Sequence, residues 1–287
     1  SDECIYPSIW DNTSPKSDSL GLRKDVMAVV KDMNVPVIRS PGGSFANTYH
    51  WENGIGARDK RPVVKNKHWG GNENHQFGTD EFLQWCENTG VNPYVNINLG
   101  SGTLDEALRW LEYCNGDATT EQGKRRAANG HADPYKVTYW GVGNEHWGKA
   151  ETGASDATTY GKNLMTWGTA LKKQDPSIRI LGVGSDDGAD PKWDTDVLEQ
   201  ASGVIDYLTL HAYSSAVNEG GDQYEAVVFS PNYFDFRIRG MLKTIEDFKA
   251  AHGVSRDIRI SMDEWAIRRF QGPKGTLDQD LRRKAPR

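Results

Sequence analysis

Short apolar runs alternate with amphipathic helical patterns along the chain, and this alternation is the feature that most constrains the fold. The runs are rich in Val, Ile and Tyr, and each predicts a strand buried on both faces. They cover residues 35–40, 92–100, 137–145, 178–185, 206–213 and 258–265. Helical patterns occupy residues 19–33, 79–90, 103–116, 159–174, 194–202 and 239–253. Strands that alternate with helices predict parallel β/α units, and therefore an α/β protein.

Polar residues stand at the C-terminal end of nearly every predicted strand. They are Arg39 and Ser40, Asn96 and Asn98, Asn144 and Glu145, Asp186 and Asp187, His211 and Tyr213, and Asp263 and Glu264. A closed (β/α)8 TIM barrel, whose site lies at the C-terminal face, produces this distribution. A doubly wound sheet would instead concentrate its ligand contacts at one switch point. The nearest glycine-rich candidate, GVGSDDG at 182–188, places two Asp where a phosphate would sit, so the barrel is favoured.

Composition and charge exclude two classes of partner. A mean hydropathy of −0.70 is too polar for a membrane-spanning chain, and a net charge of −6 argues against nucleic acid or an anionic membrane. Two basic runs, 58–67 and 281–287, are interpreted as solvated loop and tail. The first residues, SDECIYPSIW, lack the basic start and apolar core of a signal peptide, and the sequence assigns no location to the protein.

Two carboxylates remain as the candidates for catalysis. There is no HExxH or GxSxG motif, and the seven His have no metal-ligand spacing. Glu145 and Glu264 each end an apolar run and are each followed closely by Trp. A buried carboxylate beside aromatic rings is costly unless it is partnered or protonated, and two such groups suggest a function. Taken singly, either could be a salt bridge or a helix cap.

The third and sixth of the six runs carry Glu145 and Glu264 at their ends, and we take these runs as the fourth and seventh strands of a barrel. Both carboxylates would then point at one ligand across the barrel mouth. A separation of about 5 to 5.5 Å suits a retaining glycosidase, with one nucleophile and one acid/base. A gap of about 6.5 to 9.5 Å would admit water and imply inversion. The residues alone leave both outcomes open.

Seven stretches together resemble the retaining α-L-arabinofuranosidases of glycoside hydrolase family 51. In chain order they are VPVIRSPGGSFANTYHWENGIG, NINLG, LEYCNG, WGVGNEHWG, DPSIRILGVGS, YLTLHAY and ISMDEW. The resemblance covers most of residues 4 to 270. It implies that Glu145 is the general acid/base, that Asn144 holds the sugar 2-hydroxyl, and that Glu264 is the nucleophile.

The resemblance implies further roles for residues of the site. Arg39 is expected beneath the nucleophile, where a guanidinium would keep it ionised. His211 is expected to orient its neighbours and Tyr213 to hydrogen-bond the nucleophile. Trp69 and Trp147 are expected to line the sugar subsites. An interior ion pair for Arg39 and a core position for Tyr213 are the alternatives. No metal and no organic cofactor is expected.

The organisation of the chain is predicted from the same comparison. Residues 1–287 are expected to form a glycoside hydrolase (β/α) barrel with six of its eight strands recognised. The first strand, the last strand and a C-terminal β-sandwich domain of the family are not found in the sequence. Because an open parallel sheet leaves raw edges, a second chain or an oligomer is expected to complete the barrel.

The predicted function is release of terminal α-L-arabinofuranosyl residues from arabinoxylan, arabinan or derived oligosaccharides. The expected partner is thus an oligo- or polysaccharide substrate. An endo-β-1,4-glucanase or xylanase on the same scaffold, or a non-catalytic carbohydrate-binding fragment, are the alternatives. Loops 116–135 and 214–236 are expected to shape the substrate groove.

Overall fold

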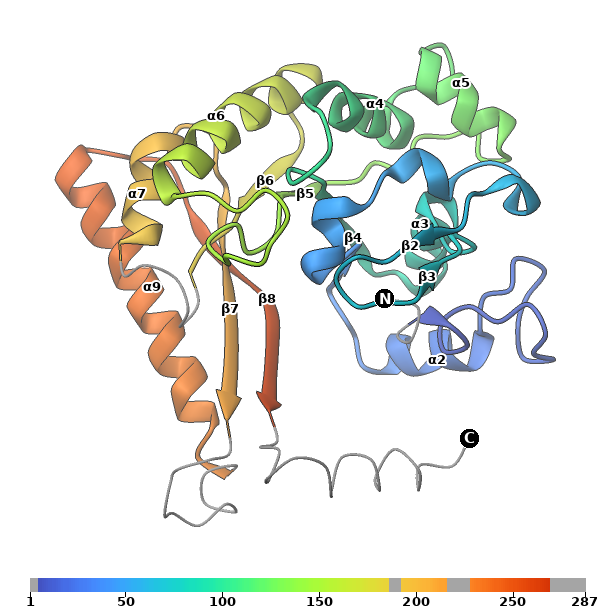
Figure 1. The fold of residues 1–287 in the computed structure, drawn as a ribbon, viewed down its shortest axis with the longest axis horizontal. Helices are drawn as coiled ribbons and strands as arrows, with labels where there is room; N and C mark the ends of the chain where they lie inside the picture. The colour runs from blue at the N-terminus through green and yellow to red at the C-terminus, as the bar shows by residue number, and fades with distance from the viewer. Residues whose placement is uncertain (1–4, 186–191, 216–227, 269–287) are drawn as a thin grey trace.

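A parallel sheet of six strands forms the centre of the structure, a computed structural model that describes residues 5–185, 192–215 and 228–268 (Figure 1). The strands follow one another in chain order, and each pairs in parallel with the next. They are β1 (Val37–Ser40), β4 (Asn92–Ile97), β5 (Tyr139–Val142), β6 (Arg179–Gly182), β7 (Tyr207–Ser215) and β8 (Arg259–Arg268). All six predicted strands are confirmed.

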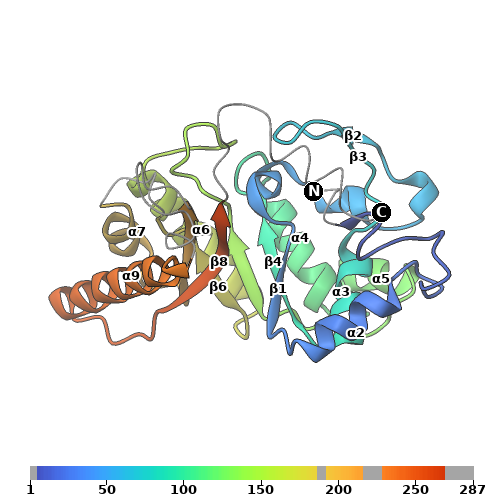
Figure 2. The ribbon, with the colours of Figure 1, turned by 90° about the horizontal axis from the view of Figure 1, so that it is seen from below.

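Helices connect the strands and lie outside the sheet. They are α2 (Lys24–Asp32), α3 (Thr79–Thr89), α4 (Leu104–Asn115), α5 (Glu121–Ala128), α6 (Ala157–Gln174), α7 (Trp193–Ala201) and α9 (Pro231–His252). Figure 2 shows α2 to α5 on one side of the strands and α6, α7 and α9 on the other. No helix in the described residues has the length and apolar character needed to cross a membrane.

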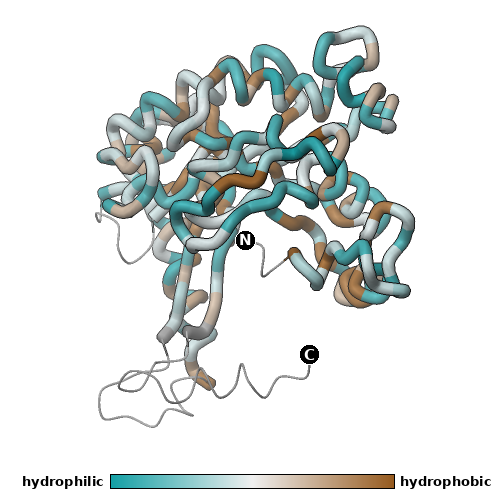
Figure 3. Tube along the Cα trace, turned by 45° about the vertical axis from the view of Figure 1, so that its right-hand side comes forward, coloured by the Kyte–Doolittle hydropathy of each residue, from teal (hydrophilic) through white to brown (hydrophobic). Residues whose placement is uncertain are grey.

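The helix boundaries follow from capping residues and from apolar faces. Thr103 caps α4 by accepting a hydrogen bond from the Glu106 backbone N–H, as its sequence pattern predicts, and Asp156 caps α6 in the same way. Gly253, in a left-handed conformation with φ 64°, ends α9. Hydrophobic and hydrophilic positions alternate along the helices (Figure 3), so each helix has an apolar side to pack on the sheet.

The sheet curls until its first and last strands share contacts. Arg39 of β1 forms ion pairs with Asp263 and Glu264 of β8, although β1 and β8 are the two ends of the strand order. Within the described residues β1 pairs only with β4, and β8 only with β7. This curvature is that of a nearly closed barrel, which confirms the predicted (β/α)8 class with six of its strands.

Tyr160 of α6 joins the ends of two neighbouring strands. Its hydroxyl donates to the Val142 carbonyl at 2.7 Å and accepts from the Val183 backbone N–H at 2.7 Å. The side chain is fully buried, and its ring stacks on Trp193 of α7. The core therefore fixes the end of β5, from which the Glu145 loop leaves.

Residues 116–135 differ from the prediction that they shape the substrate groove. Asn115, at the end of α4, exchanges hydrogen bonds with the Val137 backbone just before β5. The segment after α4 therefore leads to the start of β5, away from the barrel mouth. The segment contains α5, whose buried Arg126 donates to the Tyr113 and Gly116 carbonyls at the end of α4. In the other predicted loop, residues 216–227 lie outside the described residues and 231–236 belong to α9.

A pair of helical glycines tests the packing of the helices on the sheet. A Cβ at Gly168 in α6 would lie 2.8 Å from Cγ2 of the buried Val204, whereas one at Gly240 in α9 would meet no atom within 4 Å. Gly168→Ala should lower the free energy of unfolding by about 1–3 kcal/mol because it overpacks this contact. Gly240→Ala should raise it by about 0.5–1 kcal/mol. Urea denaturation followed by Trp fluorescence measures both, and equal changes would contradict the packing.

Candidate active site

A tight turn after β5 carries Glu145 into the barrel mouth. Gly143 has φ 83°, and a Cβ there would lie 2.2 Å from Nε2 of His146, so a glycine is required. Glu145 itself has φ 45°, a left-handed conformation that residues with a side chain seldom adopt. Such conformations persist where the surroundings hold them, and they cluster at functional sites.

A break in strand register brings Glu264 to the same place. Leu210 pairs with Met262 but His211 pairs with Glu264, so Asp263 is an extra residue in β8. In a regular strand, neighbouring side chains point to opposite faces. Here the bulge lets Asp263 and Glu264 both contact Arg39 in the barrel interior.

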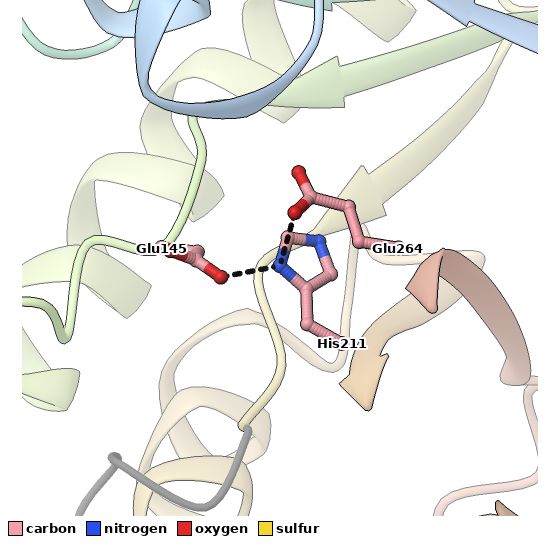
Figure 4. A group of neighbouring side chains, drawn as sticks. All are labelled: Glu145, His211 and Glu264. Carbon is pink, nitrogen blue, oxygen red and sulfur yellow. Dashed lines mark hydrogen bonds and ion pairs between the residues drawn. The ribbon is translucent and has the colours of Figure 1, made fainter. Parts of the chain in front are cut away.

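His211 lies between the two glutamates (Figure 4). Its Nδ1 is 2.7 Å from Oε1 of Glu145 and 3.7 Å from Oε2 of Glu264. One carboxylate oxygen of each glutamate and this nitrogen all lie within 4.8 Å of one another. The structure thus brings together, from the turn after β5 and from β7 and β8, three residues that the sequence predicted for the site.

Glu264 is surrounded by groups that favour its ionised form. Tyr213 donates its hydroxyl to Oε2 at 2.5 Å, and the Arg39 guanidinium pairs with Oε1. Burial acts to raise the pKa of Glu264, but the electrostatic effects of the neighbouring His211 and Arg39, together with the Tyr213 hydrogen bond, outweigh it. The pKa of Glu264 is therefore lowered, and the group is a carboxylate near neutral pH.

Arg39 connects Glu264 to a second, more deeply buried carboxylate. Its Nη1 lies 3.5 Å from Oδ2 of Asp263, which also accepts a hydrogen bond from the Tyr94 hydroxyl at 2.7 Å. Burial opposes the charge on Arg39, but Asp263 and the other acidic neighbours outweigh it, so its pKa is raised. The Asp263 side chain is 1% exposed and that of Arg39 is 10% exposed, so the pair is shielded from water.

Asn144 precedes Glu145, and only the oxygen of its side-chain amide has a hydrogen-bond partner in the described part of the chain. Its Oδ1 accepts a hydrogen bond from Nη1 of Arg39 at 3.3 Å. Its Nδ2 is buried and has no hydrogen-bond partner in the described part of the chain. A buried donor without a partner is costly, and a ligand that accepts a hydrogen bond would satisfy it.

The two tryptophans expected at the site differ in exposure. Trp69, in the turn between β2 (Val64–Lys65) and β3 (Asn72–Glu73), is 66% exposed. Its neighbour His68 lies 3.2 Å from the Thr152 hydroxyl in the loop after Glu145, which places this hairpin at the barrel mouth. Trp147 is half-buried, and its indole N–H donates to the Gly184 carbonyl at 3.2 Å, beyond β6.

Within the described residues, Glu145, His211 and Glu264 form a cluster whose spacing could also suit a metal ion. Each offers one ligand atom within the 4.8 Å cluster. Arg39 already pairs with Glu264, and Tyr213 donates to its second oxygen. A metal ion would have to compete with this guanidinium for the same negative charge.

Sequence reasoning assigns no supporting role to several residues that hold the site together. Asp263 stands at a predicted strand end, but its contact with Arg39 cannot be predicted, because alternation along a strand does not reveal the register break. Asn47, Ser44 and Glu151 form a hydrogen-bonded group behind Asn144. Ser44 and Asn47 follow the Pro-Gly-Gly turn, and that proximity to a predicted strand end is the one signal that could have indicated them.

A family model and two curated relatives all match this chain to α-L-arabinofuranosidases. The family model described as the alpha-L-arabinofuranosidase 1 domain matches residues 29–227. Alpha-L-arabinofuranosidase C of Emericella nidulans is 39% identical over 290 residues, covering 95% of this chain and 56% of that protein. An intracellular exo-alpha-(1->5)-L-arabinofuranosidase of Acetivibrio thermocellus is 34% identical over 266 residues, covering 92% and 52%. The chain thus spans about half the length of these relatives.

A solved structure extends the match to the fold. The family 51 α-L-arabinofuranosidase of Thermotoga petrophila has a TM-score of 0.83 and 41% identity, over 92% of this chain and 53% of that one. The predicted resemblance is therefore confirmed by family model, curated relatives and structure. The chain belongs to the α-L-arabinofuranosidases of glycoside hydrolase family 51.

Proposed function

We propose that the protein hydrolyses terminal α-L-arabinofuranosides with retention of anomeric configuration. The observation that carries the proposal is the proximity of Glu145 and Glu264, whose nearest carboxylate oxygens lie within 4.8 Å. This spacing supports direct attack by one carboxylate, because inversion would need a gap wide enough for water. Family membership supports the sugar, and the name of the Acetivibrio relative supports exo action on arabinan-type chains.

Glu264 is the nucleophile in this proposal. Its carboxylate attacks the anomeric carbon, the bond to the leaving oxygen breaks, and a glycosyl-enzyme forms. Arg39 and Tyr213 hold both of its oxygens and keep it ionised at the pH of reaction. The same two contacts fix its orientation toward the sugar.

Glu145 is the acid and then the base. It gives its proton to the leaving oxygen in the first step, and in the second it takes a proton from the water that attacks the anomeric carbon. That attack breaks the bond to Glu264 and releases the sugar. His211, 2.7 Å from Glu145, orients the carboxyl group and lies between the two glutamates.

The remaining site residues bind the sugar. The unpartnered Nδ2 of Asn144 donates to the 2-hydroxyl next to the reacting carbon. The exposed ring of Trp69 offers a stacking face for the part of the substrate beyond the bond that is cut. Trp147, two residues after Glu145 and anchored to the Gly184 carbonyl, is the second aromatic ring proposed to contact the sugar.

Removal of either glutamate should abolish turnover of 4-nitrophenyl α-L-arabinofuranoside. Glu264→Ala should lower kcat by at least about 10³-fold, because the carboxylate that forms the glycosyl-enzyme is removed. Glu145→Ala should lower kcat by about 10²–10⁴-fold. Azide should partly restore the Glu145 variant, because azide attacks the glycosyl-enzyme without base assistance. Steady-state kinetics with and without azide measure these effects.

The matched control is Glu199→Ala, an exposed glutamate on α7, which should keep wild-type kinetics. Wild-type turnover by the Glu264 variant would refute the nucleophile assignment. Internal cleavage of unsubstituted xylan or β-glucan without arabinofuranoside hydrolysis would point to the endo-acting alternative. Polysaccharide binding without turnover by the unaltered protein would point to a binding fragment.

Tyr213→Phe tests the ionisation of Glu264. Activity requires the carboxylate, so kcat/KM falls as the pH drops through the pKa of Glu264. Because that pKa is lowered, activity should persist to a pH below the usual range of Glu. Loss of the Tyr213 hydroxyl removes one interaction that lowers the pKa of Glu264. The acid limb of the plot of kcat/KM against pH should therefore move up by about one pH unit. In Tyr207→Phe, at the start of β7, the limb should stay in place, and an unmoved limb in Tyr213→Phe would contradict the account.

A further inference from the structure

The side-chain amide of Asn47 forms two hydrogen bonds with the backbone of Asn144, the residue before Glu145. Its Nδ2 donates to the Asn144 carbonyl at 2.7 Å, and its Oδ1 accepts from the Asn144 backbone N–H at 3.1 Å. Asn47 lies in the 3₁₀ helix η1 (Gly43–Thr48), 97 residues away in sequence, and is fully buried. One side chain thus fixes both polar groups of the residue that precedes Glu145.

Glu151 sets the direction in which this amide faces. Its Oε2 accepts the second Nδ2 hydrogen of Asn47 at 2.9 Å, and its Oε1 accepts the Ser44 hydroxyl at 2.5 Å. With these bonds the donors and the acceptor of the Asn47 side chain are engaged. A rotated amide would present its oxygen to the Glu151 carboxylate and to the Asn144 carbonyl, two repulsive contacts.

The backbone at Glu145 has an unfavourable conformation that these hydrogen bonds help to maintain. Glu145 has φ 45°, and a residue with a side chain keeps such a conformation only where its neighbours enforce it. After Glu145, the Gly148 N–H donates to the Glu145 carbonyl at 2.7 Å. Before it, Asn47 supplies both constraints. A return of Glu145 to ordinary backbone angles would swing its carboxyl group away from His211 and Glu264.

We propose that Asn47, oriented by Glu151, is a positioning residue for the proton-donating carboxyl group of Glu145. The inference rests on the proposed acid/base role of Glu145. It assigns to Asn47 a specific effect on proton transfer, beyond the stability that any buried hydrogen-bonded side chain contributes. Misplacement of a catalytic group by about 1 Å can cost about 10²-fold in rate.

Dependence on the leaving group separates this role from a merely structural one. A 2,4-dinitrophenolate departs without protonation, whereas the alcohol of methyl α-L-arabinofuranoside needs a proton from Glu145. For Asn47→Asp, kcat/KM on the methyl glycoside should therefore fall by about 10–100-fold more than on the 2,4-dinitrophenyl glycoside. The aspartate side chain keeps the shape and the bond from the Asn144 N–H but loses both donors and faces Glu151.

A second substitution should partly restore kcat/KM on the methyl glycoside relative to the 2,4-dinitrophenyl glycoside. In the double variant Asn47→Asp, Glu151→Gln, the amide introduced at position 151 can donate to the carboxylate introduced at position 47, which removes the repulsion between two carboxylates. The ratio of the two kcat/KM values should return partway toward wild type, because the introduced carboxylate still faces the Asn144 carbonyl and only its repulsion from position 151 is removed. Asn92→Asp is the matched control: Asn92 donates to the Pro36 carbonyl at the start of β4, far from the mouth, and its ratio should stay at the wild-type value.

Two outcomes would overturn the proposal. One is an equal fall on both glycosides in Asn47→Asp, with or without a lower unfolding temperature, and the other is no fall at all. Should Asn47→Asp not fold, Glu151→Ala, which alters a half-buried loop residue, must show the same leaving-group dependence or the proposal is wrong. Glu145→Ala run alongside separates the two hypotheses, since a uniform loss there would refute the acid/base role itself.

Discussion

The buried ion pairs of Arg39 with Asp263 and Glu264 are the interaction on which the rest of the site depends. They join the first strand of the sheet to the last, so the curvature of the barrel and the ionisation of Glu264 share one cause. Removing either partner from a buried pair leaves a charge without compensation, which is costly. Tyr94 on Asp263 and Tyr213 on Glu264 complete this shell. The Glu264 carboxylate therefore stays ionised although it lies in the barrel interior.

Much of the fold and the principal site residues could be predicted from sequence for one physical reason. Parallel strands end at the same face, so a polar residue at each strand end predicts a shared site without any knowledge of distances. Arg39, Glu145, His211, Tyr213 and Glu264 are brought together in this way. The roles of these residues remain predictions, whereas the strands, the barrel class and the family are confirmed.

The parts that could not be predicted depend on breaks in local rules. Alternation along β8 would send Asp263 away from Glu264, and only the register shift places both inside. Asn47 acts on Asn144 across 97 residues through a side chain that has no periodic signature. The polar, Gly-rich composition of residues 116–135 carries no information on direction, and the contacts of Asn115 with the Val137 backbone place this segment at the other end of the barrel from the mouth.

The stereochemistry of transfer tests the central claim most directly, because it reports which group attacks the sugar. The reaction of 4-nitrophenyl α-L-arabinofuranoside in aqueous methanol gives a methyl glycoside whose anomeric configuration is stable and can be read by proton NMR. The account predicts the methyl α-L-arabinofuranoside, formed by attack of Glu264 and then of methanol. The β anomer as the enzymatic product would mean a single displacement and would contradict it.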